Sequence, residues 1–303
     1  MCTQNRRQFV FAALGALLLG FTGIRAMAGE VKVEKDVLYG TVDATKLFLD
    51  AYTPDDAAGK HPGIVLIHGG GFIGGDKGFY TPMAKHLASK GYVVFSLNYR
   101  LAPKNRYPAA VDDVQRAVRW LRAHADTYHL DPDHIGALGD SAGGYLVTML
   151  GTRETRDNSA AELSKFSSKV QCVVDLYGPS DFTIPASASG VGPQGIFLLT
   201  QFFGKPPEQA LDLYKDGSPI VYVAKDSAPF LIVHGTTDPL VPVDQSRRLH
   251  DALKMAGVPV TLIELYKYNH GFLNPANPGQ TGLLADDFLD RNLKGAPIGV
   301  NAP

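Results

Sequence analysis

Apolar residues form short unbroken runs, separated by segments with helical periodicity. Six runs lack the alternation of a strand with one wet face, so they indicate strands covered on both faces: residues 63–68, 92–97, 135–138, 170–176, 230–234 and 260–265. Three segments between or after them gather their apolar positions on one helical face: residues 112–125, 245–256 and 282–292. Strands alternating with helices predict an α/β fold, with a mostly parallel central sheet, right-handed crossovers and helices on both faces.

The segment ahead of these runs has a different pattern. Residues 31–39 and 47–52 have β character, and a short turn at 40–43 separates them. The second run alternates, with Leu47, Leu49 and Ala51 on one face and Phe48, Asp50 and Tyr52 on the other. We therefore expect an antiparallel pair of strands before the parallel sheet. Since ligands bind outside the carboxyl ends of the strands in such sheets, the residues that follow each strand are the ones to inspect for chemistry.

Composition narrows the class of protein. The chain has 303 residues, 45% of them hydrophobic, which is enough to bury one sizeable core. Its formal net charge is −1 and no stretch gathers Lys and Arg, so we expect no nucleic-acid partner. No segment repeats at a fixed period. Residues 29–303 therefore predict a single compact domain.

The first 28 residues have the features of an export signal. Arg6 and Arg7 precede an apolar run at 9–24, and Ala26-Met27-Ala28 matches a small-x-small cleavage site. The run falls short of the ~20 residues that span a bilayer, so we expect cleavage after Ala28 and no stable membrane anchor afterwards. The paired arginines resemble a twin-arginine signal. We predict export to the periplasm or the medium, with the general secretory route as the alternative.

A sharp turn at residues 139–144 is the strongest chemical signal. It reads Gly-Asp-Ser-Ala-Gly-Gly and joins the apolar run at 135–138 to a segment that can be helical. A Gly-x-Ser-x-Gly pattern between a strand and a helix is typical of a nucleophile elbow, which lifts the hydroxyl of Ser141 clear of the sheet. Asp140 is expected to support the elbow, because adjacent side chains point apart.

An acid and a base follow two later strands. Asp238 lies just past the run at 230–234, and His270 lies in a glycine-flanked loop after the run at 260–265. Serine, acid and histidine thus occur in the chain order of an α/β-hydrolase triad. Asp181 also follows a strand, but a turn or helix-cap role is the stronger interpretation there. His234 is expected to end a core strand.

The run His-Gly-Gly-Gly at 68–71 follows the first core strand. Its glycines let backbone N–H groups approach a ligand closely, which is typical of an oxyanion-hole loop. A phosphate loop is disfavoured because the Lys and Ser/Thr of that motif are missing. We interpret His68 as a structural anchor of this loop rather than as a base.

Taken together, the His-Gly-Gly-Gly run, the serine elbow, Asp238 in a His-Gly-x-x-Asp-x-x-Val-Pro stretch, and His270 before Gly-Phe resemble the esterases related to hormone-sensitive lipase. They resemble still more the bacterial acetyl-xylan and feruloyl esterase-like branch. The likeness covers residues 31 to about 292 and implies an α/β-hydrolase fold. The chain departs from the lipase-related enzymes at the front, where the short strand-like segment before residue 68 leaves no room for a large N-terminal cap.

Carried over by position, the resemblance implies Ser141 as nucleophile, His270 as base and Asp238 as the acid that orients it. The N–H groups of Gly70, Gly71 and Ala142 would form the oxyanion hole. It implies a serine esterase that needs no cofactor and no metal. A serine peptidase or amidase on the same fold stays open, as does a non-catalytic binding protein, although no triad member is missing.

Without an N-terminal cap, the roof of the acyl pocket must come mainly from loops, with residues 181–214 as the candidate. Five apolar side chains there are candidate walls: Phe182, Ile196, Phe197, Phe202 and Phe203. They could equally pack a local satellite core. An open site of this kind favours short acyl groups, because each methylene that finds no pocket forgoes about 0.8 kcal/mol. We expect a small-molecule or carbohydrate ester as substrate, with acetylated or feruloylated plant-wall carbohydrate as the natural case.

Overall fold

The computed structural model describes residues 31–55 and 59–295, and the predicted signal peptide at 1–28 lies outside these ranges. Eight strands form one sheet in the order β1-β2-β4-β3-β5-β6-β7-β8. Their bounds are β1 Val31–Val42, β2 Thr45–Pro54, β3 His61–Ile67, β4 Val93–Leu97, β5 Leu130–Asp140, β6 Cys172–Leu176, β7 Phe230–Gly235 and β8 Val260–Leu265.

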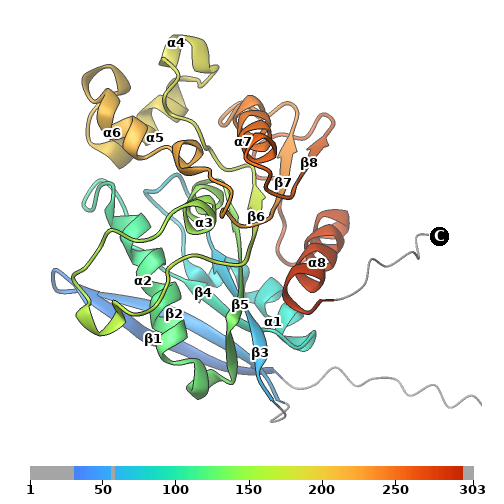
Figure 1. The fold of residues 1–303 in the computed structure, drawn as a ribbon. Helices are drawn as coiled ribbons and strands as arrows, with labels where there is room; N and C mark the ends of the chain where they lie inside the picture. The colour runs from blue at the N-terminus through green and yellow to red at the C-terminus, as the bar shows by residue number, and fades with distance from the viewer. Residues whose placement is uncertain (1–30, 56–58, 296–303) are drawn as a thin grey trace, which may run out of the picture.

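The pairing confirms the predicted mixed sheet. β1 pairs antiparallel with β2, and β2 pairs antiparallel with β4. Every other neighbouring pair is parallel. The five strands from β4 to β7 across the centre have apolar runs because helices cover both of their faces. This is the α/β-hydrolase fold with N-terminal antiparallel strands, and the described residues before the glycine loop, 31–55 and 59–67, form strands rather than a large cap (Figure 1).

Five helices cover the two faces of the sheet. They are α1 Thr81–Ser89, α2 Ala109–Ala123, α3 Ala142–Thr152, α7 Asp244–Met255 and α8 Gly279–Leu293. One core packs α2, α3 and α7 against side chains such as Val65 and Ile67, and the other packs α1 and α8 against Ile64 and Leu66. Alternate residues of β3 thus enter opposite cores, as the two faces of a strand require. Cys172 is buried in the second core, as expected for a small hydrophobe.

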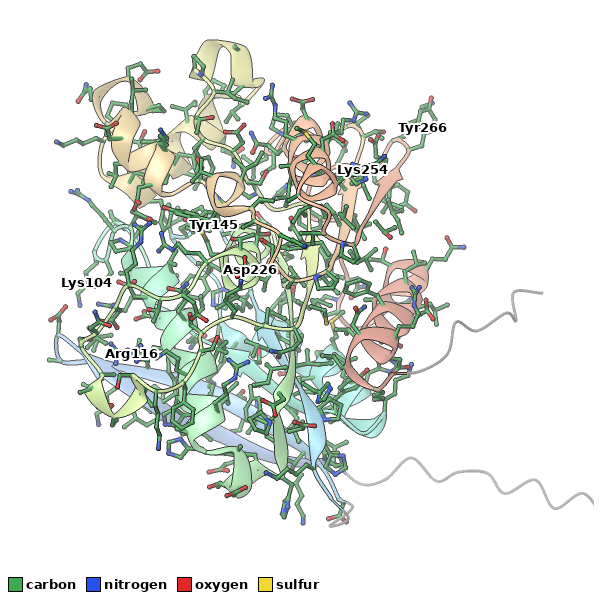
Figure 2. All side chains as sticks on the ribbon, viewed as in Figure 1. Lys104, Arg116, Tyr145, Asp226, Lys254 and Tyr266 are labelled. Carbon is green, nitrogen blue, oxygen red and sulfur yellow. The ribbon has the colours of Figure 1, made fainter. Side chains whose placement is uncertain are left out.

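The helix α1 was not anticipated from the sequence, although its apolar positions Met83, Ala84, Leu87 and Ala88 have helical spacing. Helix α2 is the predicted one, but its arginines are not solvent-exposed as an amphipathic pattern suggests. The side chain of Arg119 is 1% exposed and donates to the carbonyl oxygens of Asp157, Ala160 and Leu163. It therefore fixes the long connection between α3 and β6. Figure 2 contrasts Tyr145, buried within the fold, with Tyr266, which projects from the surface after β8.

A helical insert joins β6 to β7 and lies beyond the carboxyl ends of the strands, at the top of Figure 1. Its helices are α4 Ala186–Ser189, α5 Pro193–Phe203 and α6 Leu211–Asp216, with 3₁₀ turns at Pro207–Gln209 and Pro219–Tyr222. The segment that we expected to form loops is therefore mainly short helices. Its glycines lie at helix ends, where Gly190 and Gly204 have positive φ, rather than in extended loops.

Candidate active site

Ser141 sits in a strained turn between β5 and α3. Its φ and ψ are 53° and −117°, a conformation that few residues other than glycine adopt. A Cβ at Gly139 would lie 2.5 Å from the carbonyl oxygen of Gly143, and one at Gly143 would lie 1.9 Å from that of Ile67. The N–H of Ser141 donates to the carbonyl oxygen of Leu176 over 2.8 Å. The turn therefore leaves no room for a side chain at either glycine, as the elbow motif predicts, and the bond to Leu176 holds it in place.

The structure brings together the three side chains that the sequence singled out. The Oγ atom of Ser141 lies 2.8 Å from Nε2 of His270, and Nδ1 of His270 lies 2.6 Å from Oδ2 of Asp238. An ionised carboxylate can only accept, so Nδ1 carries a proton and Nε2 is left to accept the hydroxyl proton of Ser141. The hydrogen-bonded chain runs across the carboxyl ends of β5, β7 and β8.

The Asp238 carboxylate is held by contacts on both oxygens. Its Oδ1 accepts from the N–H groups of Leu240 and Val241, each over 2.9 Å. Burial acts to raise the pKa of Asp238, but hydrogen bonds from His234, His270 and the Val241 N–H outweigh it and lower the pKa well below its usual value. Asp238 is therefore ionised, with its charge beside the His270 ring.

The two other candidate aspartates, Asp181 and Asp140, have hydrogen-bond partners other than His270. Oδ1 of Asp181 accepts from both the N–H and the hydroxyl of Thr183, over 2.9 and 2.6 Å, which is a turn contact as predicted. Oδ1 of Asp140 accepts from the N–H of Gly69 over 2.9 Å and from the hydroxyl of Tyr80 over 2.7 Å. Burial raises the pKa of Asp140, and this effect outweighs the two hydrogen bonds, which act to lower the pKa. Asp140 thus joins the elbow to the glycine loop, as expected of a supporting residue.

The glycine loop at 68–71 needs its glycines. Gly70 and Gly71 have φ of 110° and 62°, and a Cβ at Gly70 would lie 2.2 Å from the carbonyl oxygen of Gly74. His68 is buried, stacks on Tyr99 with ring centroids 4.5 Å apart, and places Nδ1 2.7 Å from the carbonyl oxygen of Gly69. The histidine thus anchors the loop.

Two of the three predicted oxyanion-hole residues lie in the same pocket as Ser141. Gly71 and Ala142 line the same pocket as Ser141, whereas Gly70 does not. Ala142 is the first residue of α3, so its N–H is among those that a helix leaves without an internal partner. The positive end of the α3 dipole also faces this position.

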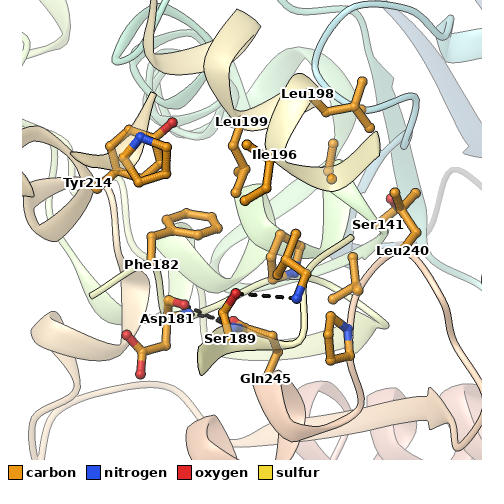
Figure 3. A pocket seen from close by; sticks show the side chains of 18 of the residues that line it. Ser141, Asp181, Phe182, Ser189, Ile196, Leu198, Leu199, Tyr214, Leu240 and Gln245 are labelled. Atoms are coloured by element: carbon orange, nitrogen blue, oxygen red, sulfur yellow. Dashed lines mark hydrogen bonds between the residues drawn. The ribbon is translucent and has the colours of Figure 1, made fainter. Parts of the chain in front are cut away.

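An apolar pocket adjoins Ser141 and encloses about 670 Å³ of unfilled space, part of it open to solvent. In Figure 3, Ser141 lies at one side of the pocket, and Phe182 and Tyr214 lie at the opposite side. Most of its apolar walls come from the insert and from the loop after Asp238: Phe182, Ile184, Val191, Ile196, Leu198, Leu199, Leu240 and Val241.

Two of the five candidate wall residues line this pocket, Phe182 and Ile196. Phe202 and Phe203 are buried in the core beneath it, and Phe197 is 54% exposed. Both interpretations of the segment thus hold in part, since some of its side chains form walls and others pack a core.

Two contacts of the site were missed from the sequence. Tyr80 bonds Asp140 from the start of α1, and no local motif marks it. His234 was expected only to end a strand, yet its Nε2 lies 3.3 Å from Oδ2 of Asp238. Its place in the His-Gly-x-x-Asp stretch was the one available signal.

Within residues 31–55 and 59–295, no group of three or more His, Cys, Asp or Glu side chains could hold a metal ion. In the same ranges, no helix has both the length and the apolar character to cross a membrane.

Comparison with known proteins places this geometry in a family. The BD-FAE family profile matches residues 49–253. The probable carboxylic ester hydrolase LipM of Mycobacterium tuberculosis is 34% identical over 84% of this chain and 60% of its own length. An ethyl acetate hydrolase of Pseudomonas putida is 30% identical over 89% of this chain and 82% of its own.

Among solved structures, a truncated carbohydrate esterase from gut microbiota superposes with a TM-score of 0.73 at 27% identity. That match covers 87% of this chain and 96% of the other. The chain spans only 56% to 64% of the length of the three mycobacterial relatives LipM, LipC and LipQ. With the family profile covering most of the domain, the chain belongs to the BD-FAE family and has the α/β-hydrolase fold.

Proposed function

We propose that this chain is a serine carboxylic ester hydrolase, with Ser141 as nucleophile, His270 as base and Asp238 as the acid that orients it. The observation that carries the proposal is the hydrogen-bonded chain from Ser141 through His270 to Asp238 at the edge of an apolar pocket. The strained elbow, the glycine loop and relatives that are named esterases support it.

The reaction follows from the positions of these groups. The Oγ of Ser141 bonds to the ester carbonyl carbon while its proton passes to Nε2 of His270. The N–H groups of Gly71 and Ala142, with that of Gly70, stabilise the resulting oxyanion. Collapse breaks the bond to the alcohol oxygen, which takes the proton from His270. Water then repeats the sequence on the acyl-enzyme, releasing the acid and restoring Ser141, while Asp238 stays ionised throughout.

We further propose short acyl esters as the preferred substrates, with acetyl or feruloyl groups on plant-wall carbohydrate as the natural case. The likeness to an ethyl acetate hydrolase supports the short acyl group, and the likeness to a carbohydrate esterase supports a carbohydrate alcohol. An assay with p-nitrophenyl esters of two to twelve carbons, acetylated xylan, feruloyl esters and aminoacyl amides tests this. Preference for ten carbons or more contradicts the short-chain proposal, and preference for amides contradicts ester hydrolysis.

The decisive variant for the mechanism is Ser141→Ala. Removing a triad nucleophile costs about 10⁶-fold in kcat, so hydrolysis of p-nitrophenyl acetate should become undetectable. The fold should persist, because Ser141 lines the pocket and is not part of either core. Circular dichroism provides the folding control. A folded variant that keeps more than a few per cent of wild-type kcat would remove Ser141 from the mechanism.

We also propose that the protein is exported and that its signal peptide is cleaved. Arg6 and Arg7, the apolar run at 9–24 and Ala26-Met27-Ala28 support a cleaved signal of the twin-arginine type. The intact mass of the protein recovered from the periplasm or medium should correspond to a chain that begins at Gly29. Recovery of a chain that still begins at Met1 would contradict cleavage.

A further inference from the structure

A second histidine lies against the Asp238 carboxylate. His234 is fully buried in β7, four residues before Asp238. Its Nε2 lies 2.8 Å from the carbonyl oxygen of Val241 and 3.3 Å from Oδ2 of Asp238. Its Nδ1 lies 2.6 Å from the hydroxyl of Ser246 in α7. Both ring nitrogens therefore have a partner although the ring has no access to water.

The partners determine which nitrogen donates. A carbonyl oxygen can only accept, so Nε2 of His234 carries a proton and donates it to Val241. Oδ2 of Asp238 is a secondary, longer contact of the same polarised N–H. The hydroxyl of Ser246 can both donate and accept, so its bond to Nδ1 does not decide the direction at that nitrogen. The donor at Nε2 is the fixed element of this arrangement.

That donor acts on both oxygens of the carboxylate. It holds the carbonyl group of Val241, a residue whose N–H donates to Oδ1 of Asp238, and it lies beside Oδ2. Among the described residues, the side-chain N–H groups that face Oδ2 are those of His270 and His234. The ring of Tyr177 lies 4.9 Å from His270 and 6.5 Å from His234, measured between centroids, and packs edge-on against both.

We infer that His234 is a positioning residue of the active site, which fixes the Asp238 carboxylate, and through it the His270 ring, by donating from Nε2. The inference rests on the proposed function, since the reaction is the readout. Loss of this donor leaves the buried carbonyl of Val241 unpaired and frees the loop that holds Oδ1. Hydrogen-bond partners that orient the ligands of metal sites typically change activity by about 10- to 100-fold, and we expect an effect of the same order for a partner that orients Asp238.

The chain offers a matched pair of substitutions at this position. His234→Gln places its amide nitrogen where Nε2 lies and can donate to Val241. His234→Asn is shorter and reaches only the side of Ser246. We expect His234→Asn to lower kcat on p-nitrophenyl acetate about 10- to 100-fold with KM changed less than about threefold, and His234→Gln to keep most of the wild-type kcat. In His234→Asn the low-field proton resonance of His270 Nδ1–H should shift or disappear.

Tyr92→Phe controls for the loss of a buried hydrogen bond elsewhere. Its hydroxyl donates to Asp290 of α8 over 2.6 Å, so the variant should lose stability without losing kcat. If His234→Asn does not fold, His234→Met, which fills the same space without a donor, takes its place.

The outcomes distinguish failure of the positioning role of His234 from failure of the proposed esterase function. Equal kcat in wild type and both His234 variants, or an equal loss in both variants, overturns the role of the Nε2 donor. A wild-type protein that hydrolyses no ester defeats the proposed function instead, and does so before any variant is made.

Discussion

Different forces hold two regions of the molecule. One region is the set of loops that carry Ser141, Asp238 and His270, and the other is the helical insert between β6 and β7. In the loops, each reacting side chain is fixed by directional hydrogen bonds of 2.6 to 2.9 Å. In the insert, aromatic packing dominates, as between Phe203 and Tyr214, whose ring centroids lie 4.1 Å apart. Reaction geometry tolerates little displacement, whereas an apolar wall can be built from many side chains of suitable volume.

The two regions meet at the oxyanion loop. A Cβ at Gly71 would lie 2.8 Å from the side chain of Leu198 in α5. The insert therefore packs directly on the backbone that is proposed to stabilise the oxyanion. A change in the insert at this contact should alter the chemistry as well as the fit of the substrate.

The largest effects are expected in the loops. His270→Ala should lower kcat by about 10⁶-fold and Asp238→Asn by about 10⁴-fold, because the acid orients the base without exchanging a proton. Asp181→Asn should keep most of the activity, since that carboxylate bonds Thr183. Steady-state kinetics on p-nitrophenyl acetate measures all three. A harmless Asp238→Asn beside a crippling Asp181→Asn would exchange the two assignments.

A methyl group added to the elbow tests how rigid that region is. Gly143→Ala brings Cβ to 1.9 Å from the carbonyl oxygen of Ile67, so the first turn of α3 must move off β3. We expect a loss of about 3 kcal/mol in the free energy of unfolding, measured by urea denaturation. Gly192→Ala in the insert is the control, since the atom nearest to its Cβ is 3.8 Å away. Equal losses of stability at Gly143 and Gly192 would contradict the expectation that the elbow is more rigid than the insert.

Filling the pocket should change selectivity more than rate. Ile196→Trp narrows the pocket beside Ser141, so butyryl esters should lose kcat/KM about tenfold relative to acetyl esters, as expected if two methylenes lose their burial at about 0.8 kcal/mol each. Phe197→Ala is the control, because that side chain is half-exposed and does not line the pocket. An equal loss on both esters would mean that the substitution disturbs the reacting groups instead.

The smallest expected effect is a change in stability when Asp216, in α6 of the insert, loses its charge. Burial acts to raise the pKa of Asp216, but hydrogen bonds from Tyr107, Arg156 and Tyr222 outweigh it and lower the pKa to about 2. The ionised carboxylate therefore contributes stability above its ordinary pKa of 3.8, and this contribution is lost as the pH falls through about 2.

Because the Asp216 side chain is 40% exposed, solvent screening should keep the contribution below about 1 kcal/mol. Asp216→Asn should lower the melting temperature at pH 6 and have less effect near pH 2. Thermal melts of both proteins across this range measure it, and a difference that does not change with pH would show that charge is not involved.

The same contrast explains how far the sequence could be interpreted. The apolar runs predicted every strand of the parallel sheet, because a strand covered on both faces has a local signature. The prediction of two covered faces was wrong for β8, which lies at the edge of the sheet and exposes Thr261 and Glu264. Ser141, Asp238 and His270 could be singled out because each follows a predicted strand and has a glycine within three residues. The roles of these residues follow from chemistry that needs specific residue types at specific places.

The insert gave no comparable signal. Whether Ile196 or Phe202 faces the pocket depends on how α5 packs on the sheet, and both are equally apolar in sequence. The contact of His234 with Asp238 depends on the path of the loop between them, which no periodicity encodes. Tyr80 reaches Asp140 across 60 positions of sequence, so only the folded chain pairs them.

The sequence separation within the hydrogen-bonded chain has a consequence for biosynthesis. Ser141 and His270 lie 129 positions apart, and His270 follows the last strand of the sheet. A ribosome-bound chain that already contains the elbow, the glycine loop and α3 still lacks its base. The proposed triad therefore cannot assemble until β8 and the loop that carries His270 have been translated and docked on β7.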